Sequence, residues 1–216
     1  MHKAIALCLA LAGPVQACET ALLLAVDVSG SIDPEEYHLQ MNGLADALAD
    51  PEIVTVLVKD KVALSLMHWS GNGYQQVSLG WHSMTTQPSV ARFAAFVRRV
   101  ERPRHYSDTA IGDAIFFSLE HLQSKTDCAR HVIDISGDGE ENAGLTLAAA
   151  RKAATDARVT INAIAIEEVP DLHPLTGYFR RWVATPDGFV ITANGVADYP
   201  RAIRIKLARE LAKPTS

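Results

Sequence analysis

The sequence Leu22-Leu23-Leu24-Ala25-Val26-Asp27-Val28-Ser29-Gly30-Ser31 decides the fold of this chain. Its apolar half predicts a β-strand buried on both faces, because a continuous apolar run bounded by turn residues is typical of a central strand in a parallel sheet. Ligands of α/β proteins bind just beyond the carboxyl ends of such strands. Asp27, Ser29 and Ser31 lie at that end, and their oxygens suit hard cations such as Mg²⁺, Ca²⁺ or Mn²⁺.

Helical and strand patterns alternate along the rest of the chain. Asp33, Pro34 and Glu36 form the pattern of a capping box, which predicts a helix from Pro34 to about Leu48. Further strands are expected at residues 61–69, 74–81, 130–136, 159–166 and 188–192, and further helices at residues 89–100, 110–123, 145–157, 173–183 and 199–211. Gly71-Asn72-Gly73 predicts a hairpin between the first two of these strands. The alternation indicates one doubly wound α/β domain, and the hairpin gives its mostly parallel sheet an antiparallel edge strand.

Two later stretches match the first motif in chemistry and position. Ser107-Asp108-Thr109-Ala110-Ile111-Gly112 places a threonine in a loop just before a predicted helix. Ile133-Asp134-Ile135-Ser136-Gly137-Asp138-Gly139 places an acid just after a predicted strand. With the first motif, they resemble the three segments of the metal-ion-dependent adhesion site of von Willebrand factor type A (vWA) domains, in the same order. Residues 133–139, 160–164 and 202–211 are also similar to a bacterial secreted branch of these domains, the group called domain of unknown function 1194.

The resemblance implies a Rossmann-like vWA fold with a mostly parallel six-stranded sheet, one antiparallel edge strand and helices on both faces. It also implies a metal site in which Ser29, Ser31 and Thr109 ligate through hydroxyls, while Asp27 and Asp138 bind directly or through water. The cation would be Mg²⁺, with Mn²⁺ or Ca²⁺ as alternatives. A protein or peptide partner would bind through an acidic group at the open coordination position, and no catalysis is expected.

The site also constrains the topology of the sheet. One ion can be shared only if Asp27 and Asp138 end adjacent parallel strands, so we expect the strand order 3-2-1-4-5-6. The sequence departs from the family pattern at Gly137, because a hydroxyl residue often precedes the acid in that family. The departure affects the surroundings of the ion and leaves the set of candidate ligands intact.

Two other functions fit parts of the same motifs. Gly137-Asp138-Gly139 also resembles the metal-binding motif of haloacid-dehalogenase-like phosphatases, which are Mg²⁺-dependent and place a nucleophilic acid after the first strand, as Asp27 is placed. Those enzymes need a second acid two residues after the nucleophile for proton transfer, and Ser29 occupies that position here. The remaining alternative is a structural domain with a vestigial ion site.

The composition is that of one globular domain. The chain has 216 residues, of which 48% are hydrophobic and 21% are charged, which indicates one domain with a sizeable core. The resemblance implies that residues 18–216 form this single vWA-like domain. The net charge of −5 argues against a nucleic-acid partner, because phosphate binding needs a concentrated basic surface. A cluster of arginines is interpreted as a solvated helix end: Arg98, Arg99, Arg102 and Arg104. Asp134 is interpreted as a hydrogen-bonded structural acid, and Glu140 and Glu141 as a solvated helical turn.

Residues 1–17 have the pattern of a secretory signal peptide. Lys3 gives a positive start, residues 4–12 form an apolar core, and Val15-Gln16-Ala17 offers a small-residue cleavage site. The apolar core is too short to span a bilayer. We therefore expect a periplasmic or secreted protein with no integral membrane span.

Removal of this signal leaves two cysteines, Cys18 and Cys128. An even number of cysteines in an exported protein suggests a disulfide. Cys18 lies nine residues before Asp27 and Cys128 ten residues before Asp138, so aligned strands would bring both cysteines together at the opposite end of the sheet. The alternative is a lipidated amino terminus at Cys18, which would leave Cys128 as a lone thiol.

Overall fold

The computed structural model describes residues 18–104, 107–167 and 174–212. Six strands form one sheet in the order β3-β2-β1-β4-β5-β6. Their bounds are β1 Cys18–Asp27, β2 Ala63–Trp69, β3 Gln75–Ser83, β4 Cys128–Gly137, β5 Val159–Glu167 and β6 Val190–Asn194. Within these residues, β3 pairs antiparallel with β2, and the other four pairings are parallel. The predicted strand order and the antiparallel edge strand are confirmed.

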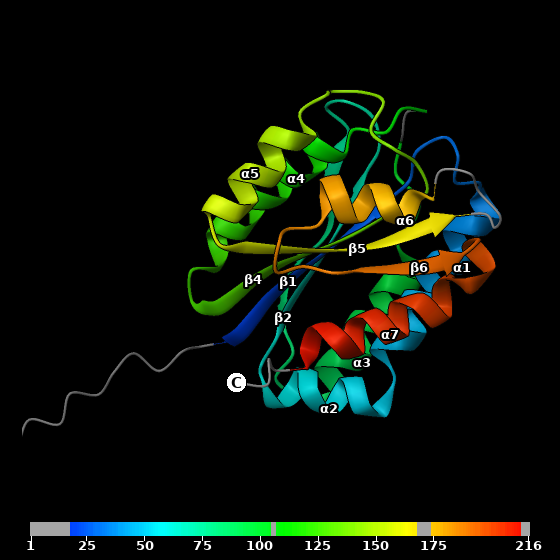
Figure 1. The fold of residues 1–216 in the computed structure, drawn as a ribbon. Coiled ribbons are helices and arrows are strands. Elements are labelled where there is room, and N and C mark those ends of the chain that lie inside the picture. Colours follow the sequence, from blue (N-terminus) through cyan, green and yellow to red (C-terminus); the bar gives the residue numbers. More distant parts are fainter. Residues whose placement is uncertain (1–17, 105–106, 168–173, 213–216) are drawn as a thin grey trace, which may run out of the picture.

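Helices cover both faces of the sheet (Figure 1). One face carries α1 Pro34–Leu48, α2 Pro51–Lys59, α3 Gln87–Arg99 and α7 Tyr199–Leu211, and the other carries α4 Ile111–Leu122, α5 Leu147–Asp156 and α6 Leu175–Tyr178. Shorter helical turns are η1 Gln123–Lys125, the π-helical η2 Phe179–Val183 and η3 Val196–Asp198. The sheet therefore separates two apolar cores, as a doubly wound α/β domain requires.

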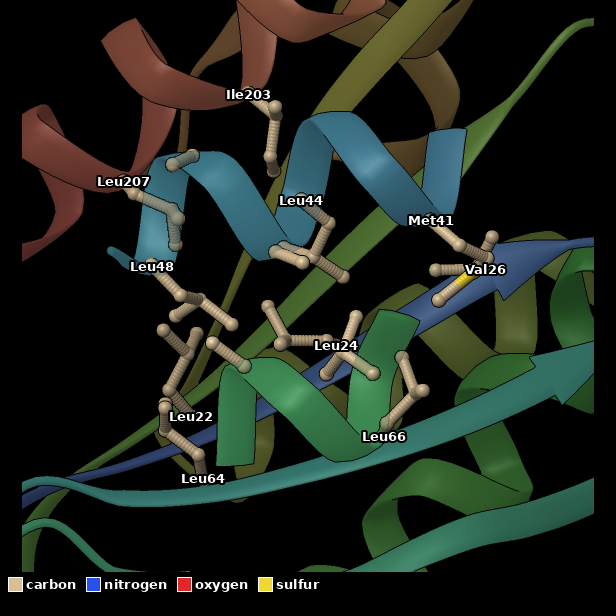
Figure 2. Packing of buried hydrophobic residues seen from close by; sticks show 14 of the residues in the cluster. Leu22, Leu24, Val26, Met41, Leu44, Leu48, Leu64, Leu66, Ile203 and Leu207 are labelled. Atoms are coloured by element: carbon tan, nitrogen blue, oxygen red, sulfur yellow. The ribbon is translucent and has the colours of Figure 1, made fainter. Parts of the chain in front are cut away.

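The central strand β1 contributes to both cores because its side chains alternate across the sheet. Leu22, Leu24 and Val26 lie in the core that α1 and α7 cover (Figure 2), whereas Leu23 and Ala25 lie in the core under α4 and α5. All five side chains are at most 2% exposed. Each large aliphatic side chain buried in this way contributes roughly 1.5–3 kcal/mol, so β1 is a rigid base for the loop that follows it.

The predicted start of α1 is confirmed at the level of its hydrogen bonds. Asp33 Oδ1 accepts a hydrogen bond from the backbone N–H of Glu36 at 2.8 Å, and Glu36 Oε2 accepts one from the N–H of Asp33 at 2.8 Å. This capping box satisfies two N–H groups that the first helical turn would otherwise leave unpaired. Because it ends the loop that carries Ser29 and Ser31, it also fixes where that loop enters α1.

Helix α2 was not predicted from the sequence. It is rich in β-branched residues, which favour strands over helices. Its start is nevertheless capped, because Asp50 Oδ1 accepts a hydrogen bond from the N–H of Glu52 at 2.9 Å, and Ile53 and Leu57 are buried four residues apart on one helix face. The helix predicted at residues 173–183 begins at Leu175, and residue 173 lies outside the described part of the chain.

A disulfide joins Cys18 and Cys128 at the amino ends of β1 and β4. The two residues are paired in the sheet register, with their Cα atoms 4.6 Å apart. The predicted disulfide is therefore confirmed, and it occupies the thiol that lipidation of Cys18 would need. The proposed signal peptide lies outside the described residues. Within residues 18–104, 107–167 and 174–212, no helix has the length and apolar character to cross a bilayer.

Candidate metal centre

Three loops meet at the carboxyl edge of the sheet. Strands β1 and β4 are adjacent and parallel, with Val26 opposite Ser136, so Asp27 and Asp138 leave the sheet side by side. The loop before α4 carries Thr109 to the same edge. The three segments that the sequence singled out are therefore brought together in space.

Asp27 is the last residue of β1 and is fully buried. Its Oδ1 accepts a hydrogen bond from the backbone N–H of Ser29 at 2.7 Å. Its Oδ2 is buried and has no hydrogen-bond partner in the described part of the chain. A buried carboxylate oxygen costs free energy unless a donor or a cation meets it, so Asp27 is the group of this site that most needs a ligand.

A chain of oxygen atoms runs from this buried acid toward the surface. Ser29 Oγ lies 3.3 Å from Ser31 Oγ, and Ser31 Oγ donates a hydrogen bond to Asp138 Oδ1 at 2.7 Å. Ser29 is fully buried, Asp138 is half-buried and Ser31 is exposed. The first loop and the loop after β4 therefore contact each other through the predicted ligand groups themselves.

Thr109 is positioned by its backbone. Its N–H donates to Asn142 Oδ1 at 2.8 Å, and its carbonyl accepts the N–H of Asn142 at 2.9 Å. The same loop touches the first loop, because the N–H of Gly30 donates to the carbonyl of Ser107 at 3.4 Å. The threonine is 4% exposed, and a Cβ atom built on Gly139 would lie 3.5 Å from its Oγ1. The Thr109 hydroxyl thus lies beside the loop that carries Asp138.

The structure gives a reason for glycine at position 137. A Cβ atom on Gly137 would lie 3.1 Å from Asp27 Oδ2 and 3.3 Å from Cζ2 of Trp69. The Trp69 indole is itself held in place, because its Nε1 donates to the carbonyl of Ala25 at 3.2 Å. A larger residue at this position would displace either the indole or the buried carboxylate. Glycine at position 137, where the family often has a hydroxyl residue, therefore leaves the space that the Trp69 indole occupies.

The electrostatics of the site favour a cation. Burial, followed by the negative charge of Asp138, raises the pKa of Asp27 to about 7. Burial also raises the pKa of Asp138, and the hydrogen bond from Ser31 opposes this shift. No salt bridge in the described part of the chain joins either acid to a basic side chain. Two carboxylates close together and without a cationic partner would be stabilised by a divalent ion.

Two residues that support the site were misinterpreted from the sequence. Arg102 does not belong to a solvated helix end, because its Nη2 donates to the carbonyls of Val28 and Ser29, each at 3.0 Å. The Glu141 carboxylate accepts the backbone N–H groups of Gly112 at 2.8 Å and Leu147 at 3.2 Å. It thereby joins the starts of α4 and α5, where negative charge is favourable. Arg102 contacts Val28 and Ser29 across more than 70 residues, and Glu141 contacts Gly112 across 29, so no local signal identifies these contacts. Only Leu147, six residues after Glu141, is close to its partner in the sequence.

The residues present fit a hard divalent cation. The five predicted ligands all bring oxygen and all lie on the three converging loops: Asp27, Ser29, Ser31, Thr109 and Asp138. Such a set suits Mg²⁺, Mn²⁺ or Ca²⁺. With two carboxylates and neutral hydroxyls, the acids balance the charge of a divalent ion and do not exceed it.

Comparison with protein families gives one match over nearly the whole chain. The family model described as "Protein of unknown function (DUF1194)" matches residues 17–215. No curated protein matches the chain.

Solved structures share the fold at low sequence identity. Proximal thread matrix protein 1 from the mussel byssus superposes with a TM-score of 0.69 at 17% identity, over 90% of this chain and 47% of its own. This mussel protein has also been solved with a zinc-occupied MIDAS motif, that is, a metal-ion-dependent adhesion site. A von Willebrand factor type A structure from Catenulispora acidiphila gives a TM-score of 0.64 at 17% identity, over 92% of this chain and 44% of its own.

A third structure, BatB from Bacteroides thetaiotaomicron, gives a TM-score of 0.59 at 16% identity, over 89% of this chain and 98% of its own. The chain thus spans less than half the length of the mussel and Catenulispora chains and nearly all of BatB. At these identities the likeness establishes the doubly wound vWA fold.

Proposed function

We propose, from the premise that this chain belongs to the DUF1194 family and has the fold of a von Willebrand factor type A domain, that it binds a protein or peptide partner through a divalent cation. The cation would be held by Asp27, Ser29, Ser31, Thr109 and Asp138. The observation that carries the proposal is the fully buried Asp27, whose Oδ2 has no hydrogen-bond partner among the described residues and which ends β1 at the sheet edge where the other candidate ligands converge.

The ligand set also suggests the chemistry of the partner. Hard cations of this size take six or more oxygens, and the chain offers five candidate groups. When bound, the cation would supply a positively charged coordination position that an acidic group of the partner can fill. The side chains of the protein hold and orient the ion: Asp27 and Asp138 balance its charge, and Arg102 fixes the carbonyls of the loop that carries Ser29.

We propose that the domain acts by binding and carries out no catalysis. In a phosphatase the position two residues after Asp27 would supply an acid for proton transfer, and Ser29 instead donates its backbone N–H to Asp27. The disulfide fits an oxidising compartment, and together with the proposed signal peptide it supports a periplasmic or secreted location. Mg²⁺ is the preferred cation of the proposal, with Mn²⁺ or Ca²⁺ as alternatives.

Affinity capture with a matched pair of variants tests this function. The wild-type protein is immobilised and exposed to the periplasmic and secreted proteins of its own source in Mg²⁺, and bound proteins are eluted with a chelator. Thr109→Ala removes one candidate ligand, whereas Ser107→Ala removes an exposed hydroxyl from the same loop. We expect the same proteins to elute from the wild-type and Ser107→Ala columns and to be absent from the Thr109→Ala column. Elution that is insensitive to the chelator or to Thr109→Ala would contradict cation-mediated binding.

A further inference from the structure

A second cluster of charged side chains lies between the sheet and α7, away from the candidate metal centre. Asp134 belongs to β4, and Lys206 and Glu210 lie one turn apart on α7. Lys206 is fully buried, and the two acids are each 3% exposed. Charged side chains are almost never fully buried unless they are paired, so this cluster needs an explanation.

The three groups are in direct contact. Lys206 Nζ is ion-paired with Asp134 Oδ1 and lies 2.6 Å from Glu210 Oε1. Asn162 on β5 orients the second acid, because its Nδ2 donates to Glu210 Oε1 at 3.1 Å. The ring of Phe189 lies 6.0 Å from Lys206 Nζ and contributes an apolar surface. The Lys206 amine therefore contacts both carboxyl groups, that of Asp134 and that of Glu210.

If all three groups are charged, the cluster carries a net negative charge in a buried site. Two carboxylates face one ammonium group. One oxygen of each acid, Asp134 Oδ2 and Glu210 Oε2, is buried without a hydrogen-bond partner among residues 18–104, 107–167 and 174–212. Taking charged groups out of water costs free energy, and pairing offsets this cost only when the remaining oxygens are also hydrogen-bonded. A neutral product of the same groups would remove that cost.

We propose that Lys206 and Asp134 condense into an amide bond, an intramolecular cross-link between α7 and β4, with Glu210 as the proton carrier. Lys206 Nζ attacks Cγ of Asp134, the new C–N bond forms, and one C–O bond of the carboxyl group breaks. The ammonium and carboxylate groups become an amide and one molecule of water. Nothing is oxidised or reduced, and no further reactant is needed.

Glu210 is placed to carry the protons. Its Oε1 touches Lys206 Nζ, so it can accept a proton from the amine and deliver it to the departing oxygen of Asp134. Burial, followed by the charge of Asp134, raises the pKa of Glu210 to about 7, which allows it to gain and lose a proton near neutral pH. A fixed geometry in an enclosed site replaces the encounter of separate reactants and favours the condensation.

Mass spectrometry of the folded, purified full chain tests the proposal. The wild type is compared with Lys206→Arg prepared in the same way, so that any processing of the termini cancels. We expect the wild type to lack the mass of one water after the Lys-to-Arg difference is subtracted. After trypsin digestion, we expect a branched peptide that joins residues 131–151 to residues 205–209, with cleavage after Lys206 blocked.

Two variants separate the roles of the groups. Glu210→Gln keeps the size of the side chain but cannot carry the proton, so we expect it to retain the full mass. Lys152→Arg changes an exposed lysine that is also paired with an acid four residues away, and we expect it to retain the wild-type loss of water. A wild-type protein of full mass would overturn the proposal whether or not any variant folds. A branch at Glu210, or a loss of water in Glu210→Gln, would overturn the assigned roles.

Discussion

The charge on Asp27 should destabilise the protein when the cation is absent, so its removal should stabilise the metal-free fold. The pKa of Asp27 is raised from 3.8 to about 7 by burial and by Asp138. Between these values the folded state binds more protons than the unfolded state, and the free energy of unfolding therefore falls as the pH rises from about 4 to about 7. At about 1.4 kcal/mol per pH unit, the loss is on the order of 4 kcal/mol.

Asp27→Asn isolates this effect. The introduced amide keeps an oxygen that can accept the Ser29 N–H bond and removes the charge. Removal of the charge should raise the free energy of unfolding at pH 8 in chelator, and the new N–H groups, which need acceptors, reduce this gain to about 2–4 kcal/mol. Near pH 4 we expect little difference between the variant and the wild type. Urea unfolding at both pH values measures the gain, and Asp46→Asn, at an exposed ion pair with Arg98, serves as the control.

The same variant should respond weakly to metal. Saturating Mg²⁺ should raise the unfolding free energy of the wild type, because a ligand that binds the folded state selectively stabilises it. Asp27→Asn removes one of the two charges that balance the ion, so its gain should be much smaller. A variant that is less stable than the wild type in chelator at pH 8, or one that gains as much from Mg²⁺, would refute the reasoning.

Three further predictions follow from other parts of the fold. Reduction of the Cys18–Cys128 disulfide, which closes a loop of sequence separation 110, should lower the unfolding free energy by roughly 4 kcal/mol in urea titrations with and without reductant; an unchanged midpoint would contradict a structural role. Glu141→Gln should cost about 1–2 kcal/mol, because the carboxylate accepts two N–H groups at the starts of α4 and α5. Glu140→Gln, at the exposed neighbouring residue, should lower the unfolding free energy little. Equal losses in the two variants would show that the hydrogen bonds of the Glu141 carboxylate do not stabilise the fold. Finally, the wild type should not hydrolyse a generic phosphate ester at any Mg²⁺ concentration, whereas hydrolysis that disappears in Asp27→Asn would establish the phosphatase alternative.

Two parts of the fold that the sequence predicted have a local cause. The apolar run of β1 and the capping box of α1 are encoded by neighbouring residues, and both are present in the structure. The pairing of Cys18 with Cys128 followed from two similar strand lengths and the expected alignment of their acids. Helix α2 was missed because its β-branched residues favour a strand, while the tertiary packing of Ile53 and Leu57 decides in favour of a helix.

The parts of the site that the sequence did not predict depend on contacts over long sequence distances. Arg102 reaches back to the carbonyls of Val28 and Ser29, and its neighbours in the sequence suggested only a solvated helix end. Glu141 bridges two helix starts that are adjacent only in the folded chain. Asp134 was interpreted as a hydrogen-bonded structural acid, and the structure pairs it with Lys206 on α7, a partner that could not be identified before the packing of that helix was known.

Calorimetric titration of Mg²⁺ and Mn²⁺ into the wild type and Asp138→Ala tests the central claim most directly. Asp138 accepts the Ser31 hydroxyl and supplies one of the two charges that would balance the ion. Its replacement removes both an oxygen and a charge from a half-buried site. We expect saturable binding of one ion to the wild type and binding weaker by at least about tenfold, or about 1.4 kcal/mol, in the variant. Equal affinity in the two proteins, or no binding to the wild type, would contradict the metal site.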